Sequence, residues 1–310
     1  MIARAIGLVG FMLLCAASAR AQQTHILVVV GSPGDDEHAA KFADWSKTFV
    51  DAAKKKDGVP DANITLLSGP QAAKASVEKA FGDIAAKAKP NDELIVLLIG
   101  HGAFDGNVAT FNIPGPDLTA ADYAKLLTRF PSQKIVFVNT ATSSGAFLQP
   151  LAGPNRVIIT STKTGGERNE PEFGQFFTAA FADDAADRDR NGHVSIAEAF
   201  EYASTKVKQD YQQKSLILTE HATLQDGDDG RLAAAFFLGI GRSNAALNAD
   251  LSDPETKKLV DAKDALEKEI AGLQLRRTSM PEADYSAQME KLLTDLALKT
   301  KAIRDRAAKK

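Results

Sequence analysis

Cysteine is nearly absent from this sequence, since its 310 residues include only Cys15, close to the N-terminus. A chain with one cysteine forms no internal disulfide, and it cannot supply the thiolates of a cysteine-rich zinc site. Its stability must therefore come from a hydrophobic core, and a chain of this length can bury one.

A strong excess of either charge is also missing. The formal net charge is −3, from 37 basic and 40 acidic residues. Nucleic-acid-binding proteins concentrate positive charge against phosphates, so the composition predicts no nucleic-acid partner.

Long apolar runs are equally scarce. After the first 21 residues no run is long enough to cross a bilayer, so no transmembrane segment is expected beyond that point.

The first 21 residues have the pattern of a secretory signal peptide. Arg4 precedes the apolar run Ala5–Ala17, and small residues follow up to Ala21. We expect cleavage after Ala21 and export to the periplasm or the medium, which would remove Cys15. Two alternatives stay open: an uncleaved anchor, or a lipidated Cys15, although Leu14 is larger than the residue that usually precedes a lipidated cysteine.

The next 220 or so residues alternate between short apolar runs and amphipathic stretches, as in an α/β domain. The runs are expected to be strands: Thr24–Gly31, Ile64–Leu67, Glu93–Ile99, Lys134–Val138 and Arg156–Ser161. The stretches His38–Lys56, Ser76–Lys89 and Leu118–Arg129 are expected to be helices, the last with Thr119 as its N-cap.

Near-continuous apolar character indicates strands that are covered on both faces of a parallel sheet. We therefore predict that Ile26–Val30, Leu94–Ile99, Ile135–Val138 and Val157–Thr160 are neighbouring parallel strands in a domain spanning residues 22–242. Functional residues of such sheets gather where the strands end at their carboxyl edge.

Residues 243–310 have a different composition, because charged residues alternate with apolar ones at intervals of three and four. This spacing predicts two helices, residues 254–277 and 281–306, in a helical hairpin or short coiled coil. The hairpin could pack on its own domain, or it could bind a partner or self-associate through residues 254–306.

The segment Asp187–Glu198, DRDRNGHVSIAE, fits the twelve-residue EF-hand loop. Gly192 takes the position of the sharp turn, and helical patterns flank the loop: Phe173–Ala182 before it and Ile196–Tyr211 after it. Its predicted calcium ligands are the side chains of Asp187, Asp189, Asn191 and Glu198, the backbone carbonyl of His193, and Ser195 through its hydroxyl or a bridging water.

Only one complete loop is present, which favours weak structural binding of calcium over signalling. The acidic stretch Asp226–Gly230 lacks the register of a second loop. The alternative interpretation of residues 187–198 is a solvated acidic turn between two helices.

Two predicted strands end in residues that carry a family resemblance. One runs into Gly100-His101-Gly102, and the other runs into NTATSSGAF, residues 139–147. In order and spacing these strand ends resemble the legumain/caspase superfamily of C13-type peptidases over about residues 24–240. There, a His-Gly carries the general base and an Asp-Ala-Cys-x-Ser-Gly-type turn carries the nucleophile. The resemblance implies a three-layer αβα caspase-like fold with a mostly parallel sheet, followed by the helical hairpin.

The sequence departs from this family at the nucleophile. Aligned without a gap, Thr142 stands at the cysteine position and Thr140 at the aspartate. A Cys-His pair works because the thiolate forms readily, whereas a threonine hydroxyl is far less acidic and needs a well-placed base. The resemblance therefore implies a degenerate catalytic site at His101, Thr142 and Ser143.

These observations predict a non-catalytic pseudopeptidase that acts as a calcium-stabilised scaffold or binds a protein or peptide partner. The first alternative is a hydrolase in which Thr142 or Ser143 attacks with His101 as the base. The second is a structural calcium-binding protein of the cell envelope. Whether either hydroxyl lies within hydrogen-bond reach of the His101 ring distinguishes the predicted function from the hydrolase.

Overall fold

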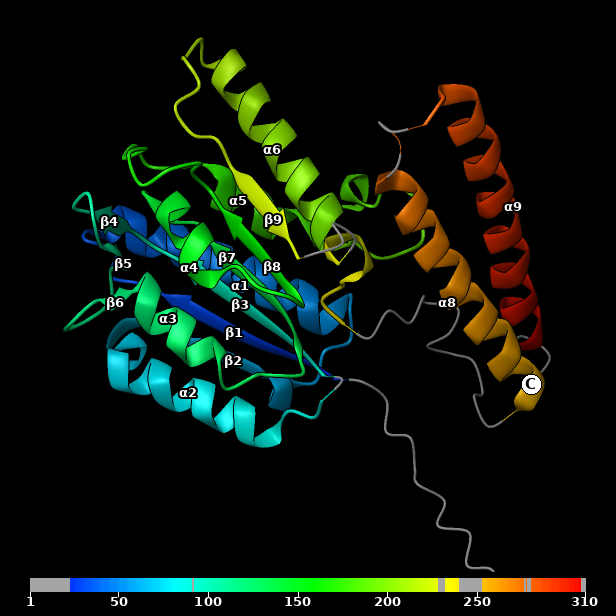
Figure 1. The fold of residues 1–310 in the computed structure, drawn as a ribbon, viewed down its shortest axis with the longest axis horizontal. Helices are drawn as coiled ribbons and strands as arrows, with labels where there is room; N and C mark the ends of the chain where they lie inside the picture. The colour runs from blue at the N-terminus through cyan, green and yellow to red at the C-terminus, as the bar shows by residue number, and fades with distance from the viewer. Residues whose placement is uncertain are drawn as a thin grey trace, which may run out of the picture.

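The computed structural model describes residues 23–90, 92–227, 232–239, 253–275, 277 and 280–307. Its centre is a six-stranded sheet in the order β2-β1-β3-β7-β8-β9 (Figure 1). The strands are β1 (Thr24–Val30), β2 (Ile64–Leu67), β3 (Glu93–Ile99), β7 (Lys134–Asn139), β8 (Arg156–Thr160) and β9 (Thr223–Asp226). The first five are parallel, and only β9 runs antiparallel to its neighbour.

The predicted parallel neighbours are confirmed. Each of the four continuous apolar runs is a strand, and β1, β3, β7 and β8 are adjacent in that order. All seven residues of β1 and of β3 are buried, as expected for strands covered on both faces.

Helices cover both faces of this sheet. One face packs against α1 (Asp36–Lys55), α5 (Phe173–Ala180) and α6 (Ile196–Gln213). The other packs against α2 (Lys74–Lys87), α3 (Ala120–Leu127) and α4 (Leu148–Leu151). Alternate strand residues point to opposite faces: Ile26 and Val28 lie in the first core, and Leu27 and Val29 lie in the second. The domain is therefore a three-layer αβα structure.

The expected helix Leu118–Arg129 is shorter in the structure. Thr119 is the N-cap, because its side chain accepts from the Asp122 N–H while the Asp122 side chain accepts from the Thr119 N–H. A cap residue is not helical, so Leu118–Thr119 instead forms strand β6 of a small antiparallel sheet with β4 (Gly102–Phe104) and β5 (Ala109–Phe111). Short 3₁₀ turns occupy Asp61–Asn63, Gly69–Ala72, Ser144–Phe147, Asp184–Ala186 and Ala233–Ala235.

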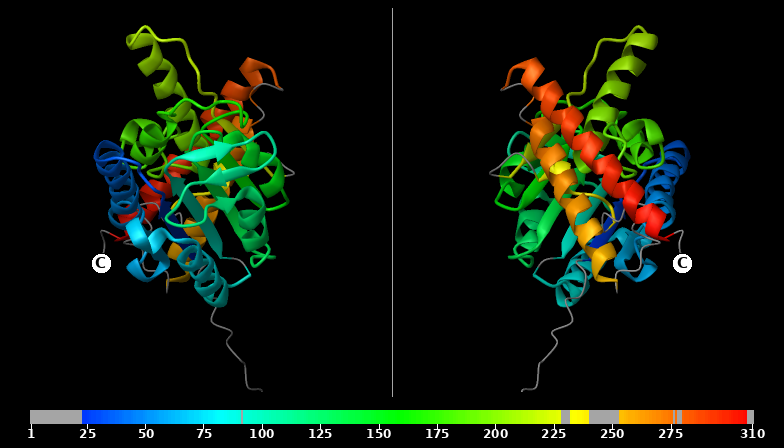
Figure 2. Two further views of the ribbon diagram at one scale, coloured as in Figure 1. Left: turned by 90° about the vertical axis from the view of Figure 1, so that its left-hand side faces the viewer. Right: turned by 90° about the vertical axis from the view of Figure 1, so that its right-hand side faces the viewer.

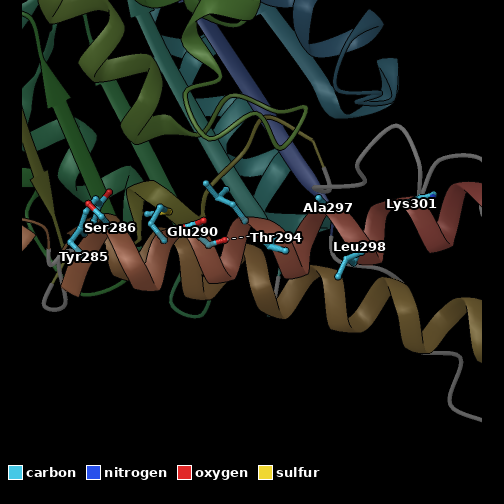
Figure 3. Close-up of a pocket in the computed structure, with 9 residues that line it drawn as sticks. Tyr285, Ser286, Glu290, Thr294, Ala297, Leu298 and Lys301 are labelled. Atoms are coloured by element: carbon cyan, nitrogen blue, oxygen red, sulfur yellow. Dashed lines mark hydrogen bonds between the residues drawn. The ribbon is translucent and has the colours of Figure 1, made fainter. Parts of the chain in front are cut away.

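The C-terminal residues form the predicted pair of helices, α8 (Pro254–Leu275) and α9 (Glu282–Ala307). The two lie side by side, next to the α/β layers (Figures 1 and 2). Their shared core includes Val260 of α8 and Ile303 of α9. One open face of α9 extends from Tyr285 to Lys301 (Figure 3).

No helix within the described residues is both long and apolar enough to cross a membrane. The expected signal peptide, residues 1–21, lies outside the described residues. Most of the acidic stretch Asp226–Gly230 lies outside them as well.

Candidate functional site

His101 stands just beyond the carboxyl end of β3, at the edge where functional residues of parallel sheets gather. Its ring atom Nε2 lies 3.0 Å from the backbone carbonyl oxygen of Pro33. A carbonyl oxygen only accepts hydrogen bonds, so Nε2 carries the proton and donates it. The ring packs edge-on against Phe42 and His38, with centroid distances of 5.2 and 4.8 Å. Its Nε2 proton is thus directed at the backbone.

Thr142 lies beyond the end of the neighbouring strand β7. Its hydroxyl is hydrogen-bonded to Gly102, the residue after His101. Its Oγ1 donates to the Gly102 carbonyl oxygen at 2.7 Å and accepts from the Gly102 N–H at 3.1 Å. The hydroxyl proton therefore points to a carbonyl and not to an imidazole. Among the described residues, no hydrogen bond joins Thr142 or Ser143 to the His101 ring.

Ser143 occupies a strained position in the same turn. Its φ is 57°, in the left-handed region that residues with a Cβ seldom adopt, and it is only 3% exposed. Its backbone N–H donates to the Glu167 carbonyl at 2.9 Å, which ties the turn to the loop after β8. Its hydroxyl makes no hydrogen bond to any residue in the described part of the chain.

Sequence reasoning missed the side chains that surround His101. His38, near the start of α1, lies between two carboxylates: Nδ1 is 2.7 Å from Asp35, and Nε2 is 2.9 Å from Glu170. Hydrogen bonds to Glu170 and Asp35 raise the pKa of His38 and so favour its imidazolium form. Only the Asp35-x-x-His38 spacing was visible in the sequence, because Glu170 lies 132 residues away along the chain.

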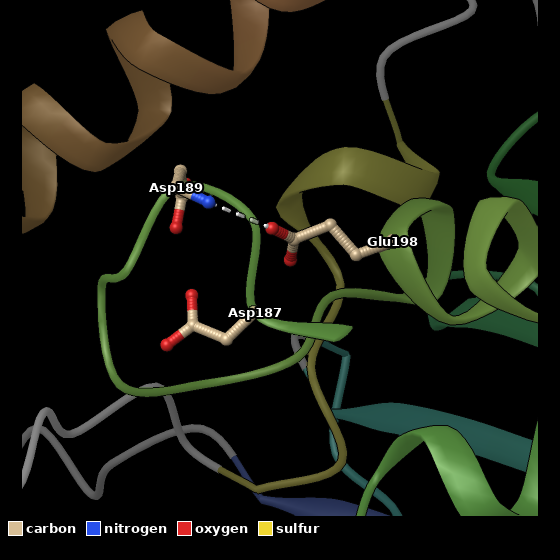
Figure 4. A group of neighbouring side chains, drawn as sticks. All are labelled: Asp187, Asp189 and Glu198. Carbon is tan, nitrogen blue, oxygen red and sulfur yellow. Dashed lines mark hydrogen bonds between the residues drawn. The ribbon is translucent and has the colours of Figure 1, made fainter. Parts of the chain in front are cut away.

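The loop 187–198 forms a second candidate site, between α5 and α6. The carboxylates of Asp187, Asp189 and Glu198 converge from three directions, with oxygen atoms within 4.8 Å of one another (Figure 4). Glu198 is 6% exposed, in the first turn of α6. The structure thus brings together the three carboxylates among the predicted ligands.

Backbone N–H groups shape the loop around Asp187. The two oxygens of its carboxylate accept from the N–H groups of Asn191 at 3.0 Å and Gly192 at 2.8 Å. Gly192 has a φ of +95°, as the turn requires. Glu198 accepts from the N–H of Arg188 at 2.9 Å, which closes the loop from the other end.

The remaining predicted ligands have other contacts. The Asn191 side-chain amide donates to Asp189 at 3.1 Å. The Ser195 hydroxyl is the N-cap of α6: it accepts from the Glu198 N–H and donates to Glu198 Oε2. His193 directs its buried ring toward Asp57, at 3.4 Å, and among the described residues its Nε2 has no hydrogen-bond partner. The role of the His193 carbonyl as a calcium ligand stays a prediction.

The converging carboxylates repel one another. Burial, followed by the charge of Glu198, raises the pKa of Asp189 to about 8. The neighbouring Arg188 pairs with Glu201 on the next turn of α6, outside the group of three carboxylates. Hard oxygen donors with excess negative charge suit a divalent cation of the calcium type. An antiparallel bridge between Ser195, inside the loop, and Phe237 ties the loop to a segment much later in the chain.

Comparison with known proteins identifies the family. Residues 44–224 match the Peptidase C13 family, which is more than half of the chain. The chain therefore belongs to the Peptidase C13 family, and the predicted resemblance is confirmed at this level. The matched segment contains His101, Thr142 and the loop 187–198.

Solved structures similar to this chain include two insect caspases. The Drosophila initiator caspase Dronc has 10% sequence identity and a TM-score of 0.41, over 66% of this chain and 78% of the caspase. Caspase-1 from Spodoptera frugiperda has 12% identity and a TM-score of 0.44, over 72% of this chain and 91% of the caspase. No curated protein matches the sequence.

Proposed function

We propose that this protein is a non-catalytic member of the Peptidase C13 family, a calcium-stabilised domain that acts as a scaffold or as a binding module for a protein or peptide. The observation that carries the proposal is the pair of hydrogen bonds between the Thr142 hydroxyl and the Gly102 backbone. His101, the residue expected to act as the base, takes no part in them.

A hydroxyl attacks a carbonyl carbon only when a base removes its proton. The Thr142 proton is directed at the Gly102 carbonyl, 2.7 Å away, which is too weak a base for this purpose. The same oxygen also accepts from the Gly102 N–H, so that lone pair is engaged and the N–H is not free to stabilise an oxyanion. The candidate nucleophile, the Thr142 hydroxyl, and the candidate oxyanion donor, the Gly102 N–H, are therefore hydrogen-bonded to each other.

The catalytic half of the proposal is tested with purified wild type and the variants Thr142→Ala, Ser143→Ala and His101→Ala on a mixed peptide library. We expect no hydrolysis above the buffer rate for any of them. Ser143→Ala is included because the alternative hydrolase attacks through Thr142 or Ser143, and the Ser143 hydroxyl makes no hydrogen bond to the described residues. Turnover by wild type that any of the three variants abolishes would overturn the proposal in favour of that hydrolase.

The calcium half is supported by the three converging carboxylates and by the raised pKa of Asp189. A divalent cation would replace the repulsion among Asp187, Asp189 and Glu198 with attraction, and Asn191 and the His193 carbonyl would complete its shell. The expected dissociation constant is weak, on the order of 10⁻⁴ to 10⁻³ M, as in extracellular modules.

Export completes the proposed function, because millimolar calcium is a condition of the cell exterior and periplasm more than of the cytosol. Fractionation of the source cells, followed by N-terminal sequencing, tests it. The expected mature N-terminus is Gln22 in the periplasmic or secreted fraction. An intact N-terminus at Met1 in the cytosolic fraction would refute export, and it would leave the role of a structural calcium-binding envelope protein untenable as well.

A further inference from the structure

Helix α9 has one face buried against the rest of the protein. Leu296 is 6% exposed and Ile303 is fully buried, in contact with the core that α9 shares with α8. These two residues lie seven positions apart and so fall on one side of the helix. This face accounts for how α9 docks on its own chain.

A second, exposed face of α9 is also apolar at its centre. This face includes Leu293 and Leu298, which are 36% and 61% exposed. They are two of the six large hydrophobic side chains that are exposed among the described residues. Thr294 and Ala297 lie between them, and Glu290 and Lys301 stand one turn beyond at either end (Figure 3). At 100° per residue these six positions span about 140° of the helix surface, and the centre of this arc lies about 130° from Leu296.

The charges along α9 are arranged so that the helix complements itself. Glu290 and Lys301 both lie on the exposed face, one toward each end and about 20° apart around the helix axis. A parallel copy would place like charges together, whereas an antiparallel copy places Glu290 beside Lys301. The exposed face is therefore complementary to a second copy of itself in one orientation only.

We propose that two copies of this chain associate through the exposed faces of α9, antiparallel and related by a two-fold axis between Asp295 and Leu296. In this register Glu290 of one copy faces Lys301 of the other, Leu293 packs beside Ala297, and Leu298 packs beside Thr294. Each pair occurs twice, as a two-fold interface demands. The proposed interface does not rest on the proposed non-catalytic function, because none of its residues belongs to the strand-edge site or to the loop 187–198, although Leu293 also lines a cavity beside Asp189 and Glu198.

A single pair of crossing helices buries less surface than a stable dimer needs, so the association is weak. Specific, long-lived interfaces bury about 800 Å² on each partner. We therefore expect a dissociation constant on the order of 10⁻⁵ M or weaker, with fast exchange between monomer and dimer.

Sedimentation velocity of the mature chain, from about 1 µM to several hundred micromolar, tests the interface. The wild type should shift from monomer to dimer over this range. Leu298→Asp should weaken dimerisation at least about tenfold by placing a charge in the apolar centre of the interface. Leu216→Asp is the matched control: Leu216 is 58% exposed, beyond the end of α6, and its replacement should leave the dissociation constant unchanged.

Charge reversal tests the antiparallel register. Glu290→Lys and Lys301→Glu should each weaken the dimer, since each places like charges opposite each other, and the double variant should regain most of the wild-type affinity. A wild type that stays monomeric throughout would overturn the proposal. So would a dimer that Leu298→Asp leaves intact, or a double variant weaker than both single ones, which would indicate another surface or another register.

Discussion

Replacing Glu198 by glutamine gives the sharpest test of the calcium loop. Glu198 contributes one of the three converging carboxylates and is 6% exposed. The isosteric amide retains its size and keeps one acceptor oxygen for the Arg188 N–H, but its NH2 group cannot accept from the Ser195 N–H as Oε2 does. The change therefore removes negative charge from the proposed cation site and also weakens the N-terminal cap of α6. The weaker cap lowers stability with and without calcium alike, so the loss of charge is measured by the difference in melting temperature between the two conditions.

The magnitude follows from mass action. With a dissociation constant of 10⁻⁴ to 10⁻³ M, free calcium near 10 mM exceeds it roughly ten- to a hundredfold, which stabilises the folded state by about 1.4 to 2.7 kcal/mol. For a domain of this size, 1 kcal/mol raises the melting temperature by about 2 to 4 °C. Wild type should thus melt about 3 to 10 °C higher in calcium than in chelator, and Glu198→Gln should show a shift below about 1 °C.

The assay is thermal unfolding followed by circular dichroism, in 10 mM calcium or in chelator. A salt that contains no magnesium brings the two buffers to the same ionic strength. Glu201→Gln is the control, because Glu201 is on the same helix, pairs with Arg188 and lies outside the three converging carboxylates. It should keep the full calcium shift. If wild type melts identically with and without calcium and calorimetry detects no binding, the loop is only an acidic turn.

Three further predictions concern stability. Thr142→Ala should leave the fold intact but lower the free energy of unfolding, measured in urea, by about 1 to 2 kcal/mol, because the Gly102 N–H and carbonyl both lose their partner. A loss above about 4 kcal/mol would show that Thr142 has a further structural role. Burial raises the pKa of Glu220 to about 7 from 4.5, so between these two pH values the folded state holds a proton that the unfolded state has lost. The free energy of unfolding should therefore fall as the pH rises from 4.5 to 7, by at most about 3 kcal/mol. Glu220→Gln should flatten that dependence in urea titrations at several pH values, and an unchanged slope would contradict the cause. Truncation after Gly241 should leave the α/β domain folded, since Phe236 and Leu238 of its core are retained; loss of the cooperative melt would mean that the helical hairpin completes that core.

The sheet could be predicted from the sequence in large part because strand burial leaves a local signal. Runs such as Glu93–Ile99 are apolar at nearly every position, and only a strand covered on both faces requires that. The edge strand Thr223–Asp226 escaped prediction for the opposite reason: it is short, half-buried and mostly polar. Its pairing with β8 depends on a neighbour more than sixty residues away along the chain.

The turn geometry of the loop 187–198 is largely local, because its residues hydrogen-bond to one another. Asp187 accepts from Asn191 and Gly192, four and five residues on, so the local chain itself folds around the Asp187 carboxylate; calcium binding there stays a prediction. The pKa values of the loop's carboxyl groups could not be predicted from the sequence. The raised pKa of Asp189 depends on burial, which α6 and the rest of the domain impose.

The strand-edge site divides in the same way. The sequence by itself determined that His101 and Thr142 follow two strands that are neighbours in the sheet, and it predicted that Thr142 stands at the family's cysteine position. Only the tertiary structure decided where their polar atoms point. Thr142 bonds to Gly102 across 40 residues, His101 to Pro33 across 68, and His38 to Glu170 across 132. Hydrogen bonds over such separations depend on angstrom-scale placement of packed strands and loops, and no local pattern of residue types encodes that placement.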